Sequence, residues 1–454
     1  MRDATTAVLE KMEADGAREP ELAAMRRRLD QLADPGAGAL PGDELEPIAP
    51  PPALEELPEP SASEARAALD GLVVLKLNGG LGTSMGLSGP KSALEVKPGR
   101  SFLDVIATQV LALRERHGAR LPLLLMNSAT TRPPSLEALA RHPDLPVDGV
   151  PADFLQGREP KLDATTHEPV SWPADPGLEW CPPGHGDLYV ALAAGGVLDD
   201  LLAAGFRTLF VSNADNLGAI ADARIAAWVA AERVPFAMEV VRGTAADRKG
   251  GHLALRDGRT VLRETAQVPD GDPSFADVQR WRSYNTNDLW IDLEALRALQ
   301  ADDPGAPELP LIVNRKTVDP SDPSSPPVLQ LESAMGAAIG AIDGARAVEV
   351  PRTRFAPVKT TDDLLVVRSD AYALGDDGRM EATSAGPGPF VALDPDHFKL
   401  LGDFERRFPA GAPSLRECTS LRVHGDVTFG AGVVVRGDVE LHGPLHVADG
   451  TVLS

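Results

Sequence analysis

The chain has 454 residues, of which 43% are hydrophobic and 24% are charged, and its formal net charge is −23. This length exceeds one ordinary hydrophobic core, so we expect two or three domains. The negative charge excludes a general binder of nucleic acid or of anionic membranes, because the phosphates of such a partner would be repelled. An anionic ligand must therefore be met by local cations, backbone N–H groups or a metal ion.

The chain carries no sign of export or of membrane insertion. No apolar run approaches the length of a membrane span, and "MRDATTAVLEKMEADG" at the N-terminus lacks the character of a signal peptide. The two cysteines, Cys181 and Cys418, form neither a CxxC pair nor a disulfide framework. These features predict a cytoplasmic protein that has no membrane partner.

The first 62 residues are predicted to form a helical segment followed by a proline-rich arm. Residues 3–15 are typical of a helix, and in residues 19–33 the apolar side chains recur at helical spacing. Seven prolines between Pro41 and Pro60 argue against regular structure there, so this stretch is predicted to be an extended arm or linker.

From residue 63 to residue 375 a pattern of strand, loop and helix repeats. Apolar runs typical of buried parallel strands lie at 72–78, 121–127, 206–212 and 235–241. Helical stretches, such as 102–116 and 219–232, lie between them. This alternation predicts a doubly wound, mostly parallel, Rossmann-like α/β core with right-handed crossovers. Ligands of such sheets bind at the carboxyl ends of strands, so the polar exits "KLNGG", "MNSATT" and "VSNADN" should converge on one site.

Residues 376–454 are predicted to form a separate C-terminal domain. Its last forty residues alternate valine with small or polar residues, and glycine recurs every few positions. This pattern resembles the short turns of a parallel β-helix, and a small antiparallel sheet is the alternative.

A glycine-rich loop, "LNGGLGTSMGLSGPKS" at 77–92, leaves the first buried strand and ends in a lysine. A Walker A loop needs Gly-Lys-Ser/Thr as consecutive residues, but Pro90 separates Gly89 from Lys91. The dinucleotide fingerprint GxGxxG is not matched either, because the glycine spacing is one residue too long. The loop therefore indicates phosphate binding of another kind, or else a tight structural turn.

The loop resembles that of the UDP-glucose pyrophosphorylase family, the eukaryotic-type UTP–glucose-1-phosphate uridylyltransferases. Other blocks resemble the family in family order from about residue 43 onward, including "LMNSATT", "FLQGREPKL", "WCPPGHGDLY", "FVSNADNLGA", "YNTNDLWIDL" and "VPRTRFAPVKTTDDLL". The resemblance implies that residues 63–375 form a nucleotidyltransferase domain. Its reaction would be uridylyl transfer from UTP to α-D-glucose 1-phosphate by direct in-line displacement with Mg²⁺, giving UDP-glucose and pyrophosphate.

The resemblance also implies a role for individual residues. It assigns catalysis to Lys359 and Lys91, and Mg²⁺ binding to Asp215. One carboxylate can suffice, because Mg²⁺ commonly keeps waters and takes phosphate oxygens as its other ligands. The residues implied to bind UTP are Leu77, Asn78, Gly79, Gly80, Lys91, Gln156, Gly184 and Lys359. Those implied to bind the sugar phosphate are His185, Asn213, Ala214, Asp215, Gly251, Asn285 and Asn287.

Several of these residues have a structural alternative. Asp215 could instead cap the helix that follows it, and Lys359 could form a surface ion pair with the acids at 362 and 363. The asparagines of "YNTND" could instead serve a turn. A cysteine nucleophile is not required, since direct displacement accounts for the motifs.

The chain departs from the family pattern at four positions. Cys181 stands in place of the usual tyrosine, Tyr284 in place of phenylalanine, Asp288 in place of asparagine and Leu87 in place of cysteine. None of these removes a charged catalytic group, and Asp288 bears on sugar selectivity. Two other functions stay open. One is a broad UDP-sugar or UDP-N-acetylhexosamine pyrophosphorylase, against which "GTSMG" argues because it lacks arginine. The other is a catalytically silent nucleotide-sugar-binding scaffold. Oligomerisation is possible in every case.

Overall fold

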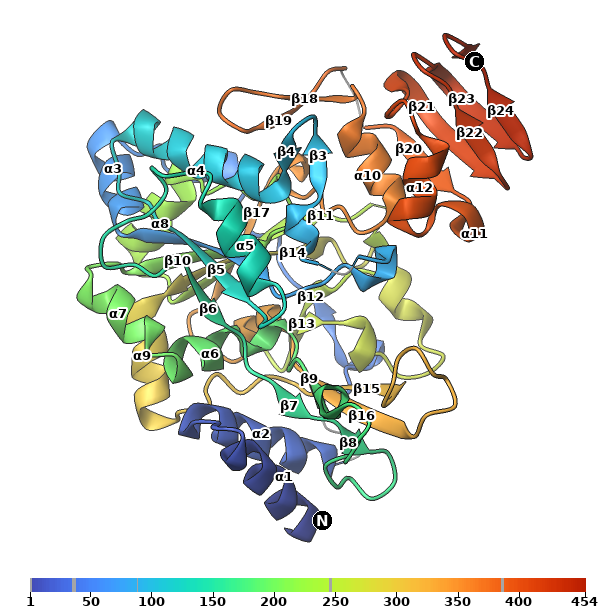
Figure 1. Ribbon diagram of the computed structural model, residues 1–454. Coiled ribbons are helices and arrows are strands. Elements are labelled where there is room, and N and C mark those ends of the chain that lie inside the picture. The colour runs from blue at the N-terminus through green and yellow to red at the C-terminus, as the bar shows by residue number, and fades with distance from the viewer. Residues whose placement is uncertain (1, 35–37, 88, 245–246, 385–387) are drawn as a thin grey trace.

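The computed structural model describes residues 2–34, 38–87, 89–244, 247–384 and 388–454. Its centre is a large mixed sheet with the strand order β1-β12-β14-β10-β2-β5-β6, to which β11, β13 and β17 add further pairings (Figure 1). The strands of this sheet are β1 (Glu46–Pro47), β2 (Leu72–Asn78), β5 (Leu123–Asn127), β6 (Asp153–Leu155), β10 (Thr208–Asn213), β11 (Phe236–Arg242), β12 (His252–Arg256), β13 (Arg259–Arg263), β14 (Ser283–Asp292) and β17 (Arg346–Glu349).

Helices join and cover these strands. They are α1 (Arg2–Ala14), α2 (Glu19–Leu32), α3 (Ala62–Asp70), α4 (Phe102–His117), α5 (Arg132–Leu139), α6 (Leu188–Ala194), α7 (Val197–Ala203), α8 (Ala223–Glu232), α9 (Leu293–Asp302), α10 (Thr361–Arg368), α11 (Pro395–Phe398) and α12 (Leu401–Arg407). The predicted N-terminal helices are confirmed as α1 and α2.

The central sheet is buried on both faces. Along β2, Val74 belongs to one hydrophobic cluster, whereas its neighbours Val73 and Leu75 belong to another. Because successive side chains of a strand point to opposite faces, the two clusters lie on opposite sides of the sheet. Side chains of α4 and α8 contribute to the first cluster, and side chains of α6, α7 and α9 to the second.

The prediction of a mostly parallel sheet holds for one part of it. Strands β10, β2 and β5 pair in parallel, as three of the apolar runs predicted, and β6 adds a further parallel strand. The fourth run, β11, pairs in parallel with β17 but antiparallel with β14. Strand β14 pairs antiparallel with both β10 and β11, and β12 pairs antiparallel with β1, β13 and β14. The sheet is therefore mixed, because β14 runs against the strands on either side of it.

Two local predictions need correction. Helix α8 begins at Ala223 and not at residue 219, because the Asp222 carboxylate caps it by accepting from the Arg224 N–H at 2.8 Å. The cap is therefore not Asp215, and that alternative is wrong. The proline-rich arm also contains regular structure, since β1 pairs with β12 at the end of the central sheet.

The N-terminal helices pack on a small sheet formed by β8 (Leu162–Asp163), β15 (Ile312–Thr317) and β16 (Pro327–Glu332). Val8 and Met25 of these helices share a hydrophobic cluster with Leu162 and Leu329. Figure 1 places α1 and α2 at one end of the molecule and the C-terminal strands at the other. Shorter pairs, β3 (Glu95–Lys97) with β4 (Arg100–Ser101) and β7 (Glu159–Pro160) with β9 (Trp180–Cys181), complete this part of the fold.

After the antiparallel pair β18 (Tyr372–Leu374) and β19 (Met380–Ala382), the C-terminal strands all pair in parallel along the described chain. They are β20 (Phe390–Leu393), β21 (Ser414–His424), β22 (Val427–Phe429), β23 (Val434–His442), β24 (Leu445–Val447) and β25 (Val452–Leu453). One ladder has the order β20-β21-β23-β25, and the other pairs β22 with β24. The antiparallel alternative for this region is therefore wrong. Within the described ranges, no helix has the length and apolarity to cross a membrane. The predicted domain boundaries, 1–62, 63–375 and 376–454, stay a prediction.

Candidate active site

A cleft of about 460 Å³ lies at the carboxyl ends of β2, β5 and β10. The three polar exits predicted to converge on one site do so, since Leu77, Met126 and Asn213 all line this cleft. The predicted site residues that line it are Leu77, Asn78, Gly79, Gly80, Lys91, Gln156, Gly184, His185, Asn213, Ala214 and Asp215. Four predicted residues, Gly251, Asn285, Asn287 and Lys359, are not among its lining.

The glycine loop brings backbone close to other walls of the cleft. A Cβ on Gly79 would lie 2.1 Å from Oε1 of Gln156, so glycine there lets the glutamine amide lie directly against the loop. Gly82 and Gly86 have φ of +61° and +72°, which side chains disfavour. These features explain three of the glycines by close approach and by turn geometry. Ser88 of the same loop lies outside the described residues.

Lys91 and Asp215 form an ion pair inside the cleft, with the Lys91 Nζ 2.7 Å from the Asp215 Oδ2. Both side chains are largely buried, at 16% and 20% exposed. The other carboxylate oxygen, Oδ1, is buried and has no hydrogen-bond partner among the described residues. An unpaired buried carboxylate oxygen is unfavourable unless something binds it.

Asp215 therefore fits a Mg²⁺ ligand. Its free Oδ1 is a hard oxygen donor, and the remaining positions of Mg²⁺ are commonly taken by waters and phosphate oxygens. The described part of the chain has no cluster of three or more His, Cys, Asp or Glu that could hold a metal by protein ligands alone. A cation at Asp215 would thus depend on the ligand's own phosphates.

Two further walls of the cleft are built by Gln156 and by Gly184 with His185. The Gln156 N–H donates to the Asn127 carbonyl at 2.8 Å, which ties the Gln156 wall to the end of β5. Gly184 has a φ of +79°, and a Cβ there would lie 2.6 Å from the Ser333 carbonyl oxygen. Both the conformation and the space at position 184 require glycine.

His185 presents one ring nitrogen to the cleft. Its Nδ1 accepts from the Met335 N–H at 3.0 Å, so the neutral ring carries its proton on Nε2. Desolvation among the surrounding protein atoms, together with the charge of Lys359, lowers the pKa of His185 to about 4. The ring is therefore a neutral hydrogen-bond donor near pH 7.

Gly251, Asn285 and Asn287 lie together beyond this cleft. Asn285 Nδ2 donates to Asn287 Oδ1 at 2.8 Å, and Asn287, whose φ is +61°, returns a backbone bond to Asn285 Oδ1 at 2.8 Å. The turn alternative is thus met in part, because this bend lies within the continuous strand β14, where its register with β11 shifts. A Cβ on Gly251 would lie 2.5 Å from Oε1 of Glu264, so glycine at this position makes room for the Glu264 carboxylate. Burial raises the pKa of Glu264, and a hydrogen bond from the Asn285 side chain opposes that rise.

Lys359 links the two groups of residues. The charge of its ammonium opposes protonation of both His185 and Glu264. The predicted surface ion pair is absent from the described structure, where no carboxylate lies within 4.0 Å of the Lys359 Nζ. Asp363 Oδ2 instead accepts from the backbone N–H groups of Lys359, at 2.7 Å, and of Thr360, at 2.9 Å. The acid fixes the backbone and leaves the ammonium unpaired.

A buried polar network connects the segments that carry Asp215 and Lys359. Asn216 Nδ2 donates to the Arg354 carbonyl at 3.0 Å, and Asn216 Oδ1 accepts from the Ala356 N–H at 3.0 Å. The Val358 N–H donates to the Asp215 carbonyl at 3.1 Å. These bonds fix the backbone beside Lys359 against the loop that holds Asp215.

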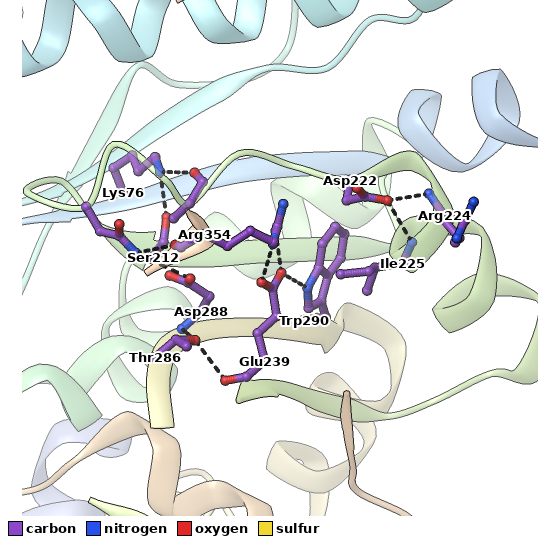
Figure 2. A network of polar contacts seen from close by, with 12 residues as sticks. Lys76, Ser212, Asp222, Arg224, Ile225, Glu239, Thr286, Asp288, Trp290 and Arg354 are labelled. Atoms are coloured by element: carbon purple, nitrogen blue, oxygen red, sulfur yellow. Dashed lines mark hydrogen bonds and ion pairs between the residues drawn. The ribbon is translucent and has the colours of Figure 1, made fainter. Parts of the chain in front are cut away.

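Charged groups below the cleft complete this network (Figure 2). Arg354 makes two bonds with Glu239, at 2.6 and 2.7 Å, and Lys76 Nζ donates to Ser212 Oγ at 2.6 Å. Burial lowers the pKa of Lys76 to about 8 and raises the pKa of Asp288. Asp288 is fully buried at the end of this network and does not line the cleft. The aspartate that replaces the family's usual asparagine at this position therefore lies outside the lining of the cleft.

Sequence reasoning missed Glu264 and Lys76. Lys76 had a signal, since it interrupts the apolar run 72–78 and a lysine inside a buried strand must find partners. Glu264 had none, because it follows β13 in a stretch that reads as an ordinary turn. Cys181 is 4% exposed, and burial raises the pKa of its thiol to about 12, which agrees with its exclusion as a nucleophile.

Comparison with known proteins gives one consistent result. The sequence profile described as UTP–glucose-1-phosphate uridylyltransferase matches residues 43–436. The protein of that name from Solanum tuberosum is 41% identical over 424 residues, which are 91% of this chain and 84% of the relative. The protein of the same name from Saccharomyces cerevisiae is 41% identical over 374 residues, which are 82% of this chain and 74% of the relative.

Solved structures agree with the sequence comparison. A UDP-glucose phosphorylase from Trypanosoma brucei superimposes with a TM-score of 0.91 at 43% identity, covering 100% of this chain and 98% of the other. A single-residue variant of UDP-glucose pyrophosphorylase from Leishmania major, in complex with UDP-glucose, has a TM-score of 0.92 at 41% identity, with 99% and 98% covered.

Proposed function

Because the chain belongs to the UTP–glucose-1-phosphate uridylyltransferase family, it forms UDP-glucose from UTP and glucose 1-phosphate, and we propose that the cleft at β2, β5 and β10 does so with Mg²⁺ by direct displacement at the α-phosphorus. The chain is thus an enzyme and not a silent scaffold.

The observation that carries the proposed mechanism is the Lys91–Asp215 pair inside the cleft, with the Asp215 Oδ1 unpartnered among the described residues. Lys359 follows Val358, whose N–H donates to the Asp215 carbonyl. In-line transfer between phosphates depends mainly on positioning and on neutralisation of charge. The chain has a net charge of −23, so local cations must provide this neutralisation. Lys91 and Lys359 are suitably placed to do so.

On the nucleotide side, uridine lies against Leu77–Gly80 and the UTP phosphates meet Lys91. The Gln156 amide offers one donor and one acceptor, which suits the imide edge of uracil, and Gly184 lines the same cleft as a second contact for the base. The contact between Gln156 and Gly79 supports this placement, because it sets the amide beside the glycine loop.

On the sugar side, we place glucose 1-phosphate between the cleft and the Asn285–Asn287 bend. Amide side chains suit hydroxyl recognition because each donates and accepts. Glu264, next to Gly251, joins them as a hydroxyl acceptor, and the His185 Nε2–H is a donor to phosphate. The remaining proposed contacts are Asn213, Ala214 and Asp215.

The reaction then needs one displacement. A phosphate oxygen of glucose 1-phosphate forms a bond to the α-phosphorus of UTP, and the bond from that phosphorus to the β-phosphate oxygen breaks as pyrophosphate leaves. Lys359 lies between the two phosphates and offsets their repulsion. Mg²⁺ bound through Asp215 would neutralise charge on the UTP phosphates. The protonated and buried state of Cys181 is compatible with a mechanism that has no covalent intermediate.

Two finer assignments belong to the same proposal. We interpret the parallel C-terminal ladders as a short β-helix, which the N-terminal arm and catalytic domain precede; the stacked parallel pairings support this. We also propose a cytoplasmic location, supported by the two free cysteines.

The test uses chromatography to measure the formation of UDP-glucose and pyrophosphate from UTP and glucose 1-phosphate. We expect both products with Mg²⁺, none with excess chelator, and full recovery when Mg²⁺ is restored. Replacing glucose 1-phosphate by N-acetylglucosamine 1-phosphate should reduce the rate strongly. Equal rates with both sugars would favour the broad-specificity alternative, and full activity with chelator would reject the role of Mg²⁺.

A further inference from the structure

Helix α2 places an arginine in the interior of the molecule, although it lies before residue 43, where the family profile begins to match. Arg28 is 6% exposed and forms an ion pair with Glu159, which is 3% exposed. A buried charge pair contributes little net stability compared with apolar packing, and its best-attested use is to specify one arrangement of the chain. The question is which arrangement this pair specifies.

The partners of Arg28 stand behind two walls of the cleft. Glu159 follows Gln156 by three residues and pairs with Cys181 across β7 and β9. Arg28 Nη2 also lies 3.4 Å from Ser333 Oγ. The backbone of Ser333 brackets Gly184, because its N–H donates to the Pro183 carbonyl at 3.0 Å and its carbonyl accepts from the Gly186 N–H at 2.8 Å.

A second contact of α2 reaches the same place. The Asp187 carboxylate accepts from the Gly157 N–H at 2.6 Å and so joins the wall of Gln156 to that of His185. A Cβ on Gly157 would lie 3.4 Å from Glu21 Oε1, so α2 packs directly behind this bond. Glu21 and Arg28 are seven residues apart and share one helix face. Burial raises the pKa of Asp187 to about 6, and the charge of Arg28 opposes that rise.

We infer that Arg28 is a positioning residue for UTP, because it fixes the Gln156 wall and the Gly184–His185 wall of the cleft relative to each other through Glu159 and Ser333. This inference rests on the proposed function, in which those walls hold uracil. It assigns a role to the N-terminal helices, which otherwise touch no predicted substrate group.

The docking of α2 does not itself depend on Arg28. Val8 and Met25 anchor the helices on Leu162 and Leu329, and Arg27 pairs with Asp303 at the start of the loop after α9. Loss of the Arg28 charge should therefore loosen the two walls while the helix stays docked. Such a change affects UTP binding more than the chemical step.

The test compares Arg28→Met with Arg27→Met, a matched control that removes a neighbouring arginine and its ion pair on the same helix. For Arg28→Met we expect the KM for UTP to rise by about tenfold or more, which is modest for misplaced binding groups. Its kcat and its KM for glucose 1-phosphate should change by less than about threefold. Arg27→Met should match the wild type in all three, and UTP binding measured by calorimetry should follow the same order.

Arg28→Met leaves Glu159 buried and unpaired, which can prevent folding. The double variant Arg28→Met/Glu159→Gln removes both charges and should fold with the KM for UTP still raised. Arg28→Lys keeps the charge but not the fork, and it should raise this KM by a smaller factor. A folded double variant, or a folded Arg28→Lys if the double variant does not fold, that binds UTP as the wild type does would overturn the inference. If the wild-type protein binds no UTP and makes no UDP-glucose, the proposed function is what fails.

Discussion

Replacing Lys359 by alanine removes the ammonium that we place between the two reacting phosphates. At about 4 Å and an effective dielectric constant of about 20, one such charge pair is worth roughly 4 kcal/mol. Part of this is already present when the substrates bind, so the loss at the transition state is smaller. Removal of one preorganised group that stabilises developing charge typically costs about 10²–10³ in turnover, and we expect a loss in that range.

The structure separates this catalytic loss from a loss of stability. Asp363 accepts from the backbone N–H of Lys359, and an alanine keeps that bond. Within the described ranges the Lys359 ammonium has no carboxylate partner within 4.0 Å, so its removal should change the free energy of unfolding by about 0.5 kcal/mol or less. Lys316, which is exposed on β15 away from the cleft, provides the matched control as Lys316→Ala.

The assay is the steady-state rate of UDP-glucose formation at saturating UTP and glucose 1-phosphate, with thermal unfolding measured on the same samples. An NMR titration of His185 adds a check that does not depend on turnover. Because the charge of Lys359 contributes to the low pKa of His185, that pKa should rise in the alanine variant but stay below its ordinary value through desolvation. A folded Lys359→Ala enzyme with near-normal turnover would refute the reasoning.

Four other changes test separate parts of the account. Asp215→Asn should lower turnover by about 100-fold or more and shift the Mg²⁺ titration to higher concentration; unchanged turnover at ordinary Mg²⁺ would place the ligand elsewhere. Glu264→Gln should raise the KM for glucose 1-phosphate with little effect on that for UTP, as initial rates would reveal. Cys181→Ser should retain most activity, and a loss of several hundredfold in a folded protein would contradict direct displacement. Burial lowers the pKa of His252 to about 3, so as pH falls this histidine takes up a proton in the unfolded chain before it does so in the folded protein. The free energy of unfolding should therefore drop from pH 6.5 toward pH 3. The midpoint of thermal unfolding should drop less over this range in the His252→Phe variant.

Much of the cleft could be predicted from the sequence, because its residues lie in short contiguous motifs at the ends of buried strands. Leu77–Gly80 and Asn213–Asp215 span the carboxyl ends of β2 and β10, and parallel strands bring such ends together. The N-terminal helices were predictable for a similar reason, since their apolar spacing is local.

What the sequence could not reveal depends on contacts between distant segments. Arg28 and Glu159 are each ordinary charged residues in their local stretches, and only the packing of α2 makes them a buried pair. The apolar run 235–241 was predicted to be a parallel strand, but β11 pairs antiparallel with β14, because hydrogen-bond direction leaves no mark in an apolar run. Glu264 reaches the sugar side through the close approach of Gly251, which no local pattern encodes.

The most direct measurement of the central claim is the exchange of labelled pyrophosphate into UTP, with and without the sugar phosphate. In direct displacement the α-phosphorus passes straight from pyrophosphate to glucose 1-phosphate. We therefore predict that label enters UTP when glucose 1-phosphate and Mg²⁺ are both present, and that none enters when glucose 1-phosphate is omitted. Exchange of label into UTP in the complete absence of glucose 1-phosphate would reveal a uridylyl-enzyme intermediate and contradict the account. A lack of exchange both with and without glucose 1-phosphate would contradict the activity itself.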